Sequence, residues 1–368
     1  MPKRLESLYF HFPFCLHLCN YCDFYKKIPQ DKAQDFKIYH DYLLASFKNH
    51  QSLIENHGYS WGNLKTLYIG GGTPSLWGKE GKIFIETLFK DNNIKLDVNC
   101  EFTLEVNPGA WNHDVLKSWK SIGANRFSLG VQSLNPEMIK YLDRVHSIED
   151  VYETLSYFKE QKLNFSVDFM LGLPKSETNN RDVIAELNEV LAYDPSHFSI
   201  YILTVKDNYK YYSDLPSEEW IEKEFLEVSD FLTSKGFVHY EVSNFALPGK
   251  MSQHNLGYWR SNSVAALGPS ATGFLKEEKL RYKWKPGIPE MEIEILTEAE
   301  FHLEKMYMAL RSEEGIKLSD FSSEISRVVS AWKERNLVHE AEGIVRLNSR
   351  GYLLLDSLMS DLFAKRLL

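Results

Sequence analysis

The sequence predicts an α/β fold in which six strand-and-helix units form an open, partial barrel and a small winged-helix-like domain follows. Three observations favour this fold. Six short segments are apolar nearly throughout, polar or glycine-containing turns follow them, and segments of helical pattern separate them. Strands of this composition are typical of a parallel sheet covered by helices, and right-handed crossovers join such strands. Six units are too few to close an eight-stranded barrel, so we expect the sheet to stay open.

The predicted strands occupy the first part of the chain, with helices between them. The strands are residues 8–12, 64–69, 102–106, 126–131, 164–170 and 198–203. Apolar residues at helical spacing predict helices over 30–57, 114–122, 148–161, 179–193 and 218–235. Because the carboxyl ends of parallel strands share one edge of a sheet, the polar residues that end or follow these strands should gather there.

We expect three regions: a core over residues 1–235, an extension over 236–290 that begins with a strand-like run, and a C-terminal domain over 291–368. Proline and glycine in a charged stretch near residue 290 predict the second boundary. Helical patterns over 298–311, 318–334 and 350–362, with a hairpin-like run over 337–347, indicate the winged-helix-like domain. Such domains often bind DNA, but the formal net charge of −9 favours a packing or docking role and predicts no nucleic-acid partner.

The amino terminus offers no sign of export. Met1 to Ser7 lead directly into the first predicted strand, without an apolar signal core or a small-residue cleavage site. No apolar run approaches the length needed to cross a membrane. We therefore expect no transmembrane segment and a cytoplasmic location, where thiols stay reduced.

Three of the four cysteines, Cys15, Cys19 and Cys22, lie in one short loop after the first predicted strand. A structural zinc site normally takes four ligands in two spaced pairs, and no second pair at zinc-finger spacing follows. Thiolates also hold iron–sulfur clusters, and a 4Fe-4S cluster with only three protein cysteines keeps one iron open to an outside ligand. The alternative is that these three cysteines bind no metal and are simply buried apolar residues. Cys100 stands alone, and we expect it to be a core or strand-edge residue.

The spacing Cys-x3-Cys-x2-Cys, with Tyr21 just before the last cysteine, resembles the signature of the radical S-adenosylmethionine (SAM) superfamily. In that superfamily the methionine amino and carboxylate groups of SAM occupy the open iron. The resemblance therefore implies a (β/α)6 partial TIM barrel of the radical SAM type, a 4Fe-4S cluster, SAM, and an electron donor for the cluster. It also implies that the chemistry belongs to the cofactors and requires no dedicated general base.

A glycine-rich turn, Gly70-Gly71-Gly72-Thr73, follows the second predicted strand. Glycines let a backbone approach a ligand closely, but the Lys-Ser/Thr of a Walker loop does not follow them. Alone, the turn would be interpreted as structural. Placed one strand after the cysteine loop, it resembles the superfamily motif that holds the methionine amino group of SAM.

Charged or amide side chains near the strand ends must find partners, because burying them unpaired costs about 1–3 kcal/mol or more. An ion pair between Glu105 and Arg144 is one interpretation. The motifs over residues 9–15, 70–74, 105–108, 130–133 and 168–174 resemble instead the oxygen-independent coproporphyrinogen III oxidase branch of the superfamily. That resemblance implies a SAM site made by Tyr9, Tyr21, Gly71, Gly72, Thr73, Glu105, Gln132, Arg144 and Asp168. The Asp168 carboxylate would accept hydrogen bonds from the ribose hydroxyls.

Two features depart from the oxidases of this branch. Those enzymes carry a longer N-terminal region and a fourth cysteine two residues after the third, where this chain has Phe24. In their place, His254-Asn255-x-x-Tyr258-Trp259 resembles the motif of the HemW-type haem chaperones. This implies a protein that binds haem or another porphyrin and delivers it to haem-accepting proteins, with His254 as the candidate iron ligand. A core histidine is the alternative at that position.

At the level of function, an enzyme stays open as an alternative to the chaperone: it would decarboxylate coproporphyrinogen III to protoporphyrinogen IX by radical chemistry. A radical SAM enzyme that acts on RNA is disfavoured by the negative net charge. We name no catalytic residue.

Overall fold

The structure is a computed structural model, and it describes residues 3–206, 208–320 and 323–364. Its centre is a nine-stranded sheet with the order β7-β8-β6-β5-β4-β3-β2-β1-β9. The six expected strands lie parallel to one another in this sheet, which confirms the predicted open α/β fold. They are β1 (Lys3–Phe12), β2 (Tyr59–Gly71), β3 (Leu96–Val106), β4 (Arg126–Gln132), β5 (Phe165–Leu171) and β6 (His197–Ile202).

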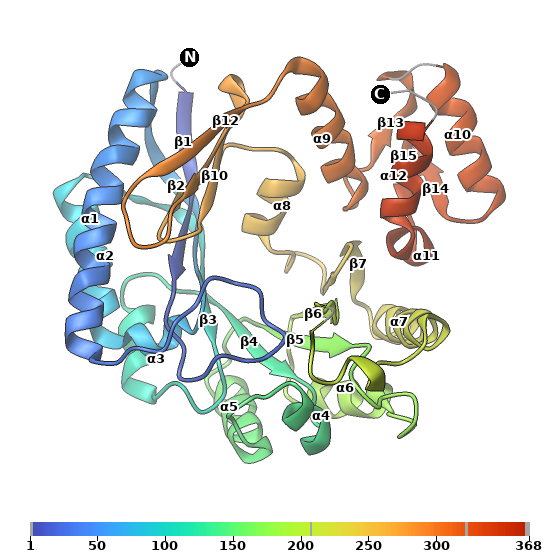
Figure 1. Cartoon of the computed structure of the whole chain (residues 1–368), viewed down its shortest axis with the longest axis horizontal. Helices are drawn as coiled ribbons and strands as arrows, with labels where there is room; N and C mark the ends of the chain where they lie inside the picture. The colour runs from blue at the N-terminus through green and yellow to red at the C-terminus, as the bar shows by residue number, and fades with distance from the viewer. Residues whose placement is uncertain (1–2, 207, 321–322, 365–368) are drawn as a thin grey trace.

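Helices connect these strands and cover one face of the sheet (Figure 1). They are α1 (Lys32–Asn56), α2 (Gly78–Asp91), α3 (His113–Lys120), α4 (Pro136–Tyr141), α5 (Ile148–Glu160), α6 (Val183–Leu191) and α7 (Glu218–Ser234). Sequence reasoning had named no helix over α2 or α4. The expected helix over residues 179–193 is shorter than predicted, because its first residues form turns before the N-cap of Asp182, whose carboxylate accepts the N–H of Ala185.

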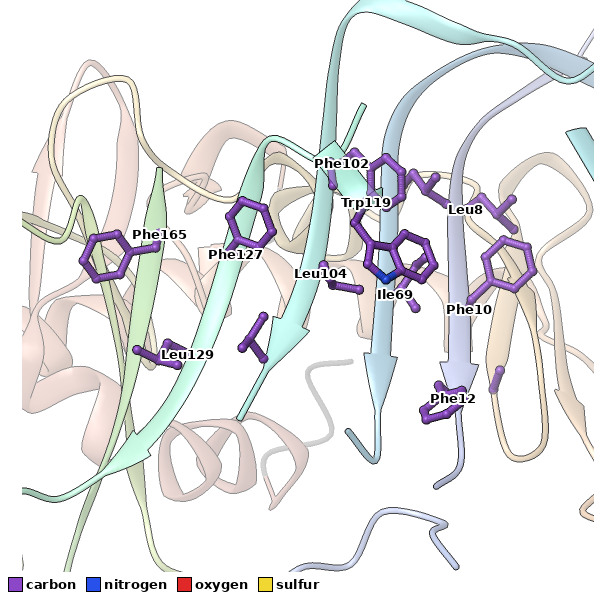
Figure 2. Packing of buried hydrophobic residues seen from close by; sticks show 14 of the residues in the cluster. Leu8, Phe10, Phe12, Ile69, Phe102, Leu104, Trp119, Phe127, Leu129 and Phe165 are labelled. Carbon is purple, nitrogen blue, oxygen red and sulfur yellow. The ribbon is translucent and has the colours of Figure 1, made fainter. Parts of the chain in front are cut away.

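The two faces of the sheet differ in chemistry because side chains alternate along a strand. The face toward the helices is apolar: Figure 2 shows Phe10, Ile69, Leu104 and Phe127 of neighbouring strands together with Trp119 of α3. The opposite, inner face is polar, and the register aligns its side chains in rows across the strands. One row is Tyr9, Tyr68, Thr103 and Arg126. This inner face offers the polar groups that a bound cofactor would need.

The extension adds strands at both edges of the sheet. β8 (Asn244–Ala246) lies antiparallel beside β6, and β7 (Val238–Glu241) pairs antiparallel with β8 at the edge of the sheet. At the other edge, β9 (Ala265–Leu267) lies parallel beside β1. Between them, α8 (Gln253–Trp259) lies between the sheet and α9 (Figure 1). A separate antiparallel sheet joins β10 (Thr272–Leu275), β11 (Leu280–Trp284) and β12 (Met291–Ile295), so this sheet crosses the boundary that we expected near residue 290.

The C-terminal region has a hydrophobic cluster of its own, built around Trp332, Val345 and Leu358. Its strands β13 (Ile316–Lys317), β14 (Val338–Ala341) and β15 (Ile344–Leu347) form a small antiparallel sheet. Its helices are α9 (Glu298–Leu310), α10 (Ser323–Glu334), α11 (Ser349–Leu353) and α12 (Leu355–Ala364), so two helices occupy the place where one was expected over 350–362. The expected hairpin over 337–347 is confirmed as β14 and β15.

None of the helices within the described ranges is both long enough and apolar enough to cross a bilayer.

Candidate functional site

The cysteine loop begins where β1 ends and is closed by backbone hydrogen bonds. The N–H of Lys27 donates to the carbonyl oxygen of Pro13 at 2.7 Å, and the N–H of Cys15 donates to the carbonyl oxygen of Lys27 at 3.0 Å. These bonds bring the two ends of the loop together. Within it Cys15 is buried, whereas Cys19 and Cys22 are half-buried, and all the cysteines of the chain are free thiols.

The glycine turn after β2 lies directly against this loop. The N–H of Gly72 donates to the carbonyl oxygen of Phe12 at 2.7 Å, and that of Thr73 donates to the carbonyl oxygen of Phe14 at 2.8 Å. Gly71 has a backbone φ of +115°, a conformation that residues other than glycine rarely adopt. The turn therefore needs glycine for its conformation as well as for its close approach to the cysteines.

The three sulfurs of the loop face one cavity of about 340 Å³. Within the described part of the chain, no three His, Cys, Asp or Glu side chains gather closely enough to share a single metal ion. Three cysteines that line one cavity without meeting at a single point suit a cluster in which each thiolate binds a different iron atom. The residues thus fit a 4Fe-4S cluster better than a single tetrahedral zinc ion.

Burial raises the pKa of the Cys15 and Cys19 thiols above the usual value. A hydrogen bond with Thr73 opposes this shift at Cys15, and the positive charge of Arg144 opposes it at Cys19. The protein therefore supplies a donor or a cation next to these two thiols, and both favour the thiolate that binds iron.

A second cavity, of about 430 Å³, extends over the inner face of the sheet. It shares Tyr21, Cys22, Gly71, Gly72, Asn107 and Arg144 with the cysteine cavity, so the two are contiguous. Between them they collect most of the predicted site residues. These are Cys15, Cys19, Cys22, Tyr21, Gly71, Gly72, Thr73, Glu105, Gln132, Arg144 and Asp168.

Glu105 accepts two hydrogen bonds at the wall of the second cavity. The backbone N–H of Gly71 donates to Oε2 at 3.0 Å, and the hydroxyl of Tyr68 donates to Oε1 at 2.9 Å. Burial nevertheless raises the pKa of Glu105 to about 7, and these two bonds only partly offset it. The Glu105 carboxyl group therefore fixes the glycine turn from the β3 side at the wall of the cavity.

Arg144 comes from the loop between α4 and α5. Its Nη2 atom donates to Oδ1 of Asn107 at 3.0 Å and to the carbonyl oxygen of Gly130 at 2.8 Å. Neither partner is Glu105, so the ion pair with Glu105 that the sequence allowed is wrong: Glu105 faces Tyr68 and Gly71 from the middle of the sheet. Asn107 also donates to Oγ1 of Thr73 at 2.8 Å, which links Arg144 to the glycine turn.

Asp168 and Gln132 occupy the far side of the second cavity. The hydroxyl of Ser128 donates to Asp168 at 3.2 Å, and burial raises the pKa of Asp168 to about 6. Gln132 ends β4 with a φ of +71° at an irregularity of the β4–β5 register. A non-glycine residue in that conformation is strained, and strain of this kind is found where a structure fixes a functional side chain.

Two predicted site residues lie outside both cavities. The hydroxyl of Tyr9 lies 3.1 Å from Nδ1 of His11, and the Tyr9 ring packs near Tyr68. His254, on α8, is buried against the inner face, where its Nδ1 lies 2.8 Å from Oγ1 of Thr66. Its Nε2 atom has no hydrogen-bond partner, and burial lowers the pKa of His254 to about 3, so the imidazole is neutral.

Sequence reasoning missed three polar residues that line the second cavity, Asn107, Ser128 and Tyr201, and a fourth, Tyr68, that contacts its wall through Glu105. Tyr68 bonds to Glu105, Ser128 bonds to Asp168, and Asn107 and Tyr201 line the wall. Tyr68, Ser128 and Tyr201 occur at alternating positions of the strands on the polar face. That alternation was the available signal, but the strands had been interpreted as apolar nearly throughout.

A buried ion network below the cavity rim joins the ends of β4 and β5. Arg181 donates from Nε to Glu186 at 2.7 Å and from Nη1 to the carbonyl oxygen of Met170 at 2.7 Å. Glu186 accepts the backbone N–H of Leu134 at 2.6 Å, and Glu224 accepts that of Gly172 at 2.9 Å while lying 3.5 Å from the guanidinium. One arginine thus fixes the turns that follow Gln132 and Asp168.

Comparison with known proteins gives a consistent assignment. The model of the radical SAM superfamily matches residues 9–188. The haem chaperone HemW of Lactococcus lactis is 31% identical over 341 residues, which cover 88% of this chain and 86% of the relative. The haem chaperone HemW of Bacillus subtilis is 30% identical over 377 residues, which cover 95% of this chain and 97% of the relative.

Among solved structures, coproporphyrinogen III oxidase (HemN) of Escherichia coli, a radical SAM enzyme, superposes with a TM-score of 0.78. The alignment covers 98% of this chain and 90% of that chain at 21% identity. At this identity the likeness establishes the fold: the partial barrel and the C-terminal region are arranged alike in both proteins.

Proposed function

Because the chain belongs to the HemW family within the radical SAM superfamily, we propose that it is a haem chaperone, which binds haem and delivers it to haem-accepting proteins. The observation that carries this proposal is the extent of the similarity, which reaches 95% of the chain for one haem chaperone. The enzyme alternative has only the likeness of fold in its support.

The radical SAM family binds a 4Fe-4S cluster and SAM, and we propose which residues serve each cofactor here. Cys15, Cys19 and Cys22 hold the cluster, because their sulfurs share a cavity that opens toward the inner face of the sheet. Cys100 lies apart in β3 and takes no part. When bound, the reduced cluster supplies one electron to SAM, so an electron donor belongs to the expected partners.

SAM lies in the second cavity, where the chain offers groups of the appropriate charge. The carboxylate of Glu105 adjoins the glycine turn and suits the methionine amino group, whereas the guanidinium of Arg144 suits the methionine carboxylate. Tyr21, Gly71, Gly72 and Gln132 complete the wall, and Thr73 adjoins them from the cysteine cavity. Asp168 accepts hydrogen bonds from the ribose hydroxyls. Tyr9 supports this site from below through its packing against Tyr68.

We propose His254 as a haem ligand. Its Nε2 atom is unpartnered, and its imidazole is neutral, as an iron ligand must be. Because the side chain is buried on α8, ligation requires α8 to move away from Thr66 and the inner face.

The cytoplasm is the proposed compartment. All four cysteines are free, and three of them are needed as thiolates, which a reducing compartment preserves.

One experiment separates the two functions. The cluster is reconstituted without oxygen, and the same sample is titrated with haem and assayed with coproporphyrinogen III, SAM and a reductant. We expect haem binding and no protoporphyrinogen. His254→Ala should alter the Soret band and weaken haem binding but leave the cluster spectrum intact, since the cysteine loop is separate. His50→Ala, an equally buried histidine that packs against Trp61, is the matched control. Formation of protoporphyrinogen would favour the enzyme alternative. Equal haem binding with and without His254 would show that another residue is the haem ligand.

A further inference from the structure

A third cavity, of about 310 Å³, lies where the sheet meets the C-terminal region. Tyr201 and Thr204, at the end of β6, line it from the sheet side, and Tyr352 and Leu355 line it from α11 and α12. Tyr201 and Thr204 also line the second cavity, so the two cavities adjoin at the end of β6. A ligand in the third cavity would therefore be next to the proposed SAM site.

Backbone hydrogen bonds fix the wall of this cavity in place. The N–H of Val242 donates to the carbonyl oxygen of Arg311 at 2.8 Å, and the N–H of Glu313 donates to that of Tyr240 at 2.7 Å. The segment after α9 thus continues the edge of the sheet beyond β7. Arg311 is consequently held at the cavity by its own main chain.

The guanidinium of Arg311 is positioned by aromatic rings. It lies 5.0 Å from the ring centre of Trp259 and 5.4 Å from that of Tyr307, within the range of cation–π contacts. Its Nη1 atom donates to the hydroxyl of Tyr307 at 2.9 Å, and that hydroxyl donates to Asp356 at 2.8 Å. Trp259, the last residue of the His254 motif, therefore contacts an arginine that lines this cavity.

Among the described residues, no carboxylate forms an ion pair with Arg311, and the Tyr307 hydroxyl is the one acceptor that its five N–H donors reach. Asp356 also lines the cavity, but it is engaged by Tyr307. The charge of Arg311 also acts on Glu241, a buried acid outside the cavity: burial raises the pKa of Glu241 to about 7, and Arg311 offsets a small part of that shift. Glu241 is thus partly protonated at neutral pH and leaves the arginine available to an outside anion.

We propose that the third cavity binds a propionate carboxylate of haem, with Arg311 as the anion-binding residue. This inference rests on the proposed haem-binding function and adds to it a second anchor, distinct from the iron ligand. An arginine fork pairs well with a carboxylate, and Ser243 offers a hydroxyl beside it. The apolar side chains of Ile200, Phe225, Leu353 and Leu355 supply a surface for the edge of the macrocycle.

The test compares haem with haem dimethyl ester, which lacks the carboxylate charges. The full-length protein should bind haem more tightly than the ester. Arg311→Met should weaken haem binding by about 10- to 100-fold, the loss of a charged hydrogen bond, and leave the affinity for the ester unchanged. Arg311→Lys should lie between. Arg335→Met, at an exposed arginine outside this cavity, is the matched control and should change neither affinity.

The outcomes are distinguishable from failure of the haem-chaperone proposal. If the protein binds neither haem nor its ester, the proposed function fails. If it binds both equally, or if Arg311→Met weakens both to the same extent, haem binding stands and the role of Arg311 is overturned. Should Arg311→Met not fold, the comparison of the two ligands with the natural protein and with Arg311→Lys still decides the matter.

Discussion

A Cβ atom at Gly72 would lie 3.0 Å from the sulfur of Cys15 and 2.6 Å from the carbonyl oxygen of Phe14. Real Cβ atoms essentially never approach backbone atoms this closely. The glycine turn and the cysteine loop are therefore packed directly against each other. Cys15 can occupy its position only because Gly72 has no side chain. Cluster binding and the proposed SAM site share this contact.

Gly72→Ala should impair cluster assembly while the fold is kept. The added methyl group must displace the backbone at Phe14 and with it the sulfur of Cys15. We expect lower iron and sulfide content after anaerobic reconstitution, with little change in the circular dichroism spectrum. Gly257→Ala is the matched control, because nothing lies within 4 Å of the position of its Cβ atom. Equal iron content in both variants would contradict the argument.

Serine substitutions should divide the four cysteines into two classes. Cys15→Ser, Cys19→Ser and Cys22→Ser should each reduce the iron bound after reconstitution, since each sulfur lines the cluster cavity. Cys100→Ser should leave iron content unchanged, because Cys100 is a buried residue of β3 outside that cavity. Loss of the cluster from the Cys100 variant, together with its retention in the Cys19 variant, would show that the assignment is wrong.

The parallel sheet was predictable because each strand carries its own apolar signal. The register of the sheet and its polar inner face were not predicted, although residues 102–106 and 126–131 alternate apolar with polar side chains. Thr103, Glu105 and Ser128 occupy the polar positions of that alternation. The apolar residues of this alternation were enough to identify the strands, and the polar residues between them line or support the candidate site.

Contacts between distant segments could not be derived from the sequence. Thr66 and His254 are 188 residues apart, and only the folded chain brings the imidazole to the inner face of β2. Likewise, the sequence offered two charged side chains near strand ends, Glu105 and Arg144, but not their partners. Glu105 bonds to a glycine N–H and a tyrosine hydroxyl. Arg144 bonds to an asparagine side chain and a backbone carbonyl oxygen.

Asp168→Ala should weaken SAM binding by about 1–3 kcal/mol, the cost of a lost hydrogen-bonding carboxylate. The Asp168 side chain lines the second cavity, where the hydroxyls of Ser128 and Ser199 donate to it and the charges of Arg126 and Arg144 lie nearby. Isothermal calorimetry with the reconstituted protein measures the effect. Asp194→Ala, at a surface aspartate that pairs with Lys159, should bind SAM like the natural protein. Unchanged affinity in the Asp168 variant would argue against this placement.

The same carboxylate should make the free protein less stable as the pH rises. The folded-state pKa of Asp168 is raised to about 6 from 3.8, so the folded chain binds more protons than the unfolded chain between these values. Stability therefore falls as pH rises through this window. Asp168→Asn removes this titrating carboxyl group. The unfolding free energy of the variant, relative to that of the natural protein, should therefore increase from pH 4 to pH 7. Urea unfolding at several pH values, without SAM, tests this, and a pH-independent difference would contradict it.

Arg181→Met should be among the most destabilising single substitutions in the core. The Arg181 side chain is fully buried, and its removal leaves Glu186 and Glu224, also almost fully buried, without their countercharge. Breaking a buried pair in this way costs about 3–5 kcal/mol, which denaturant unfolding would measure. Arg335→Met, at an exposed position, should change stability by no more than about 0.5 kcal/mol.

A second variant separates the charge of Arg181 from its geometry. Arg181→Lys keeps the positive charge but loses the fork that reaches Glu186 and the carbonyl oxygen of Met170 at once. Because those bonds fix the turns after Gln132 and Asp168, we expect the lysine variant to fold and to retain the cluster yet to bind SAM more weakly. Iron content and SAM affinity are measured on one sample of the lysine variant. A SAM affinity equal to that of the natural protein would show that Arg181 contributes to stability but not to the SAM site.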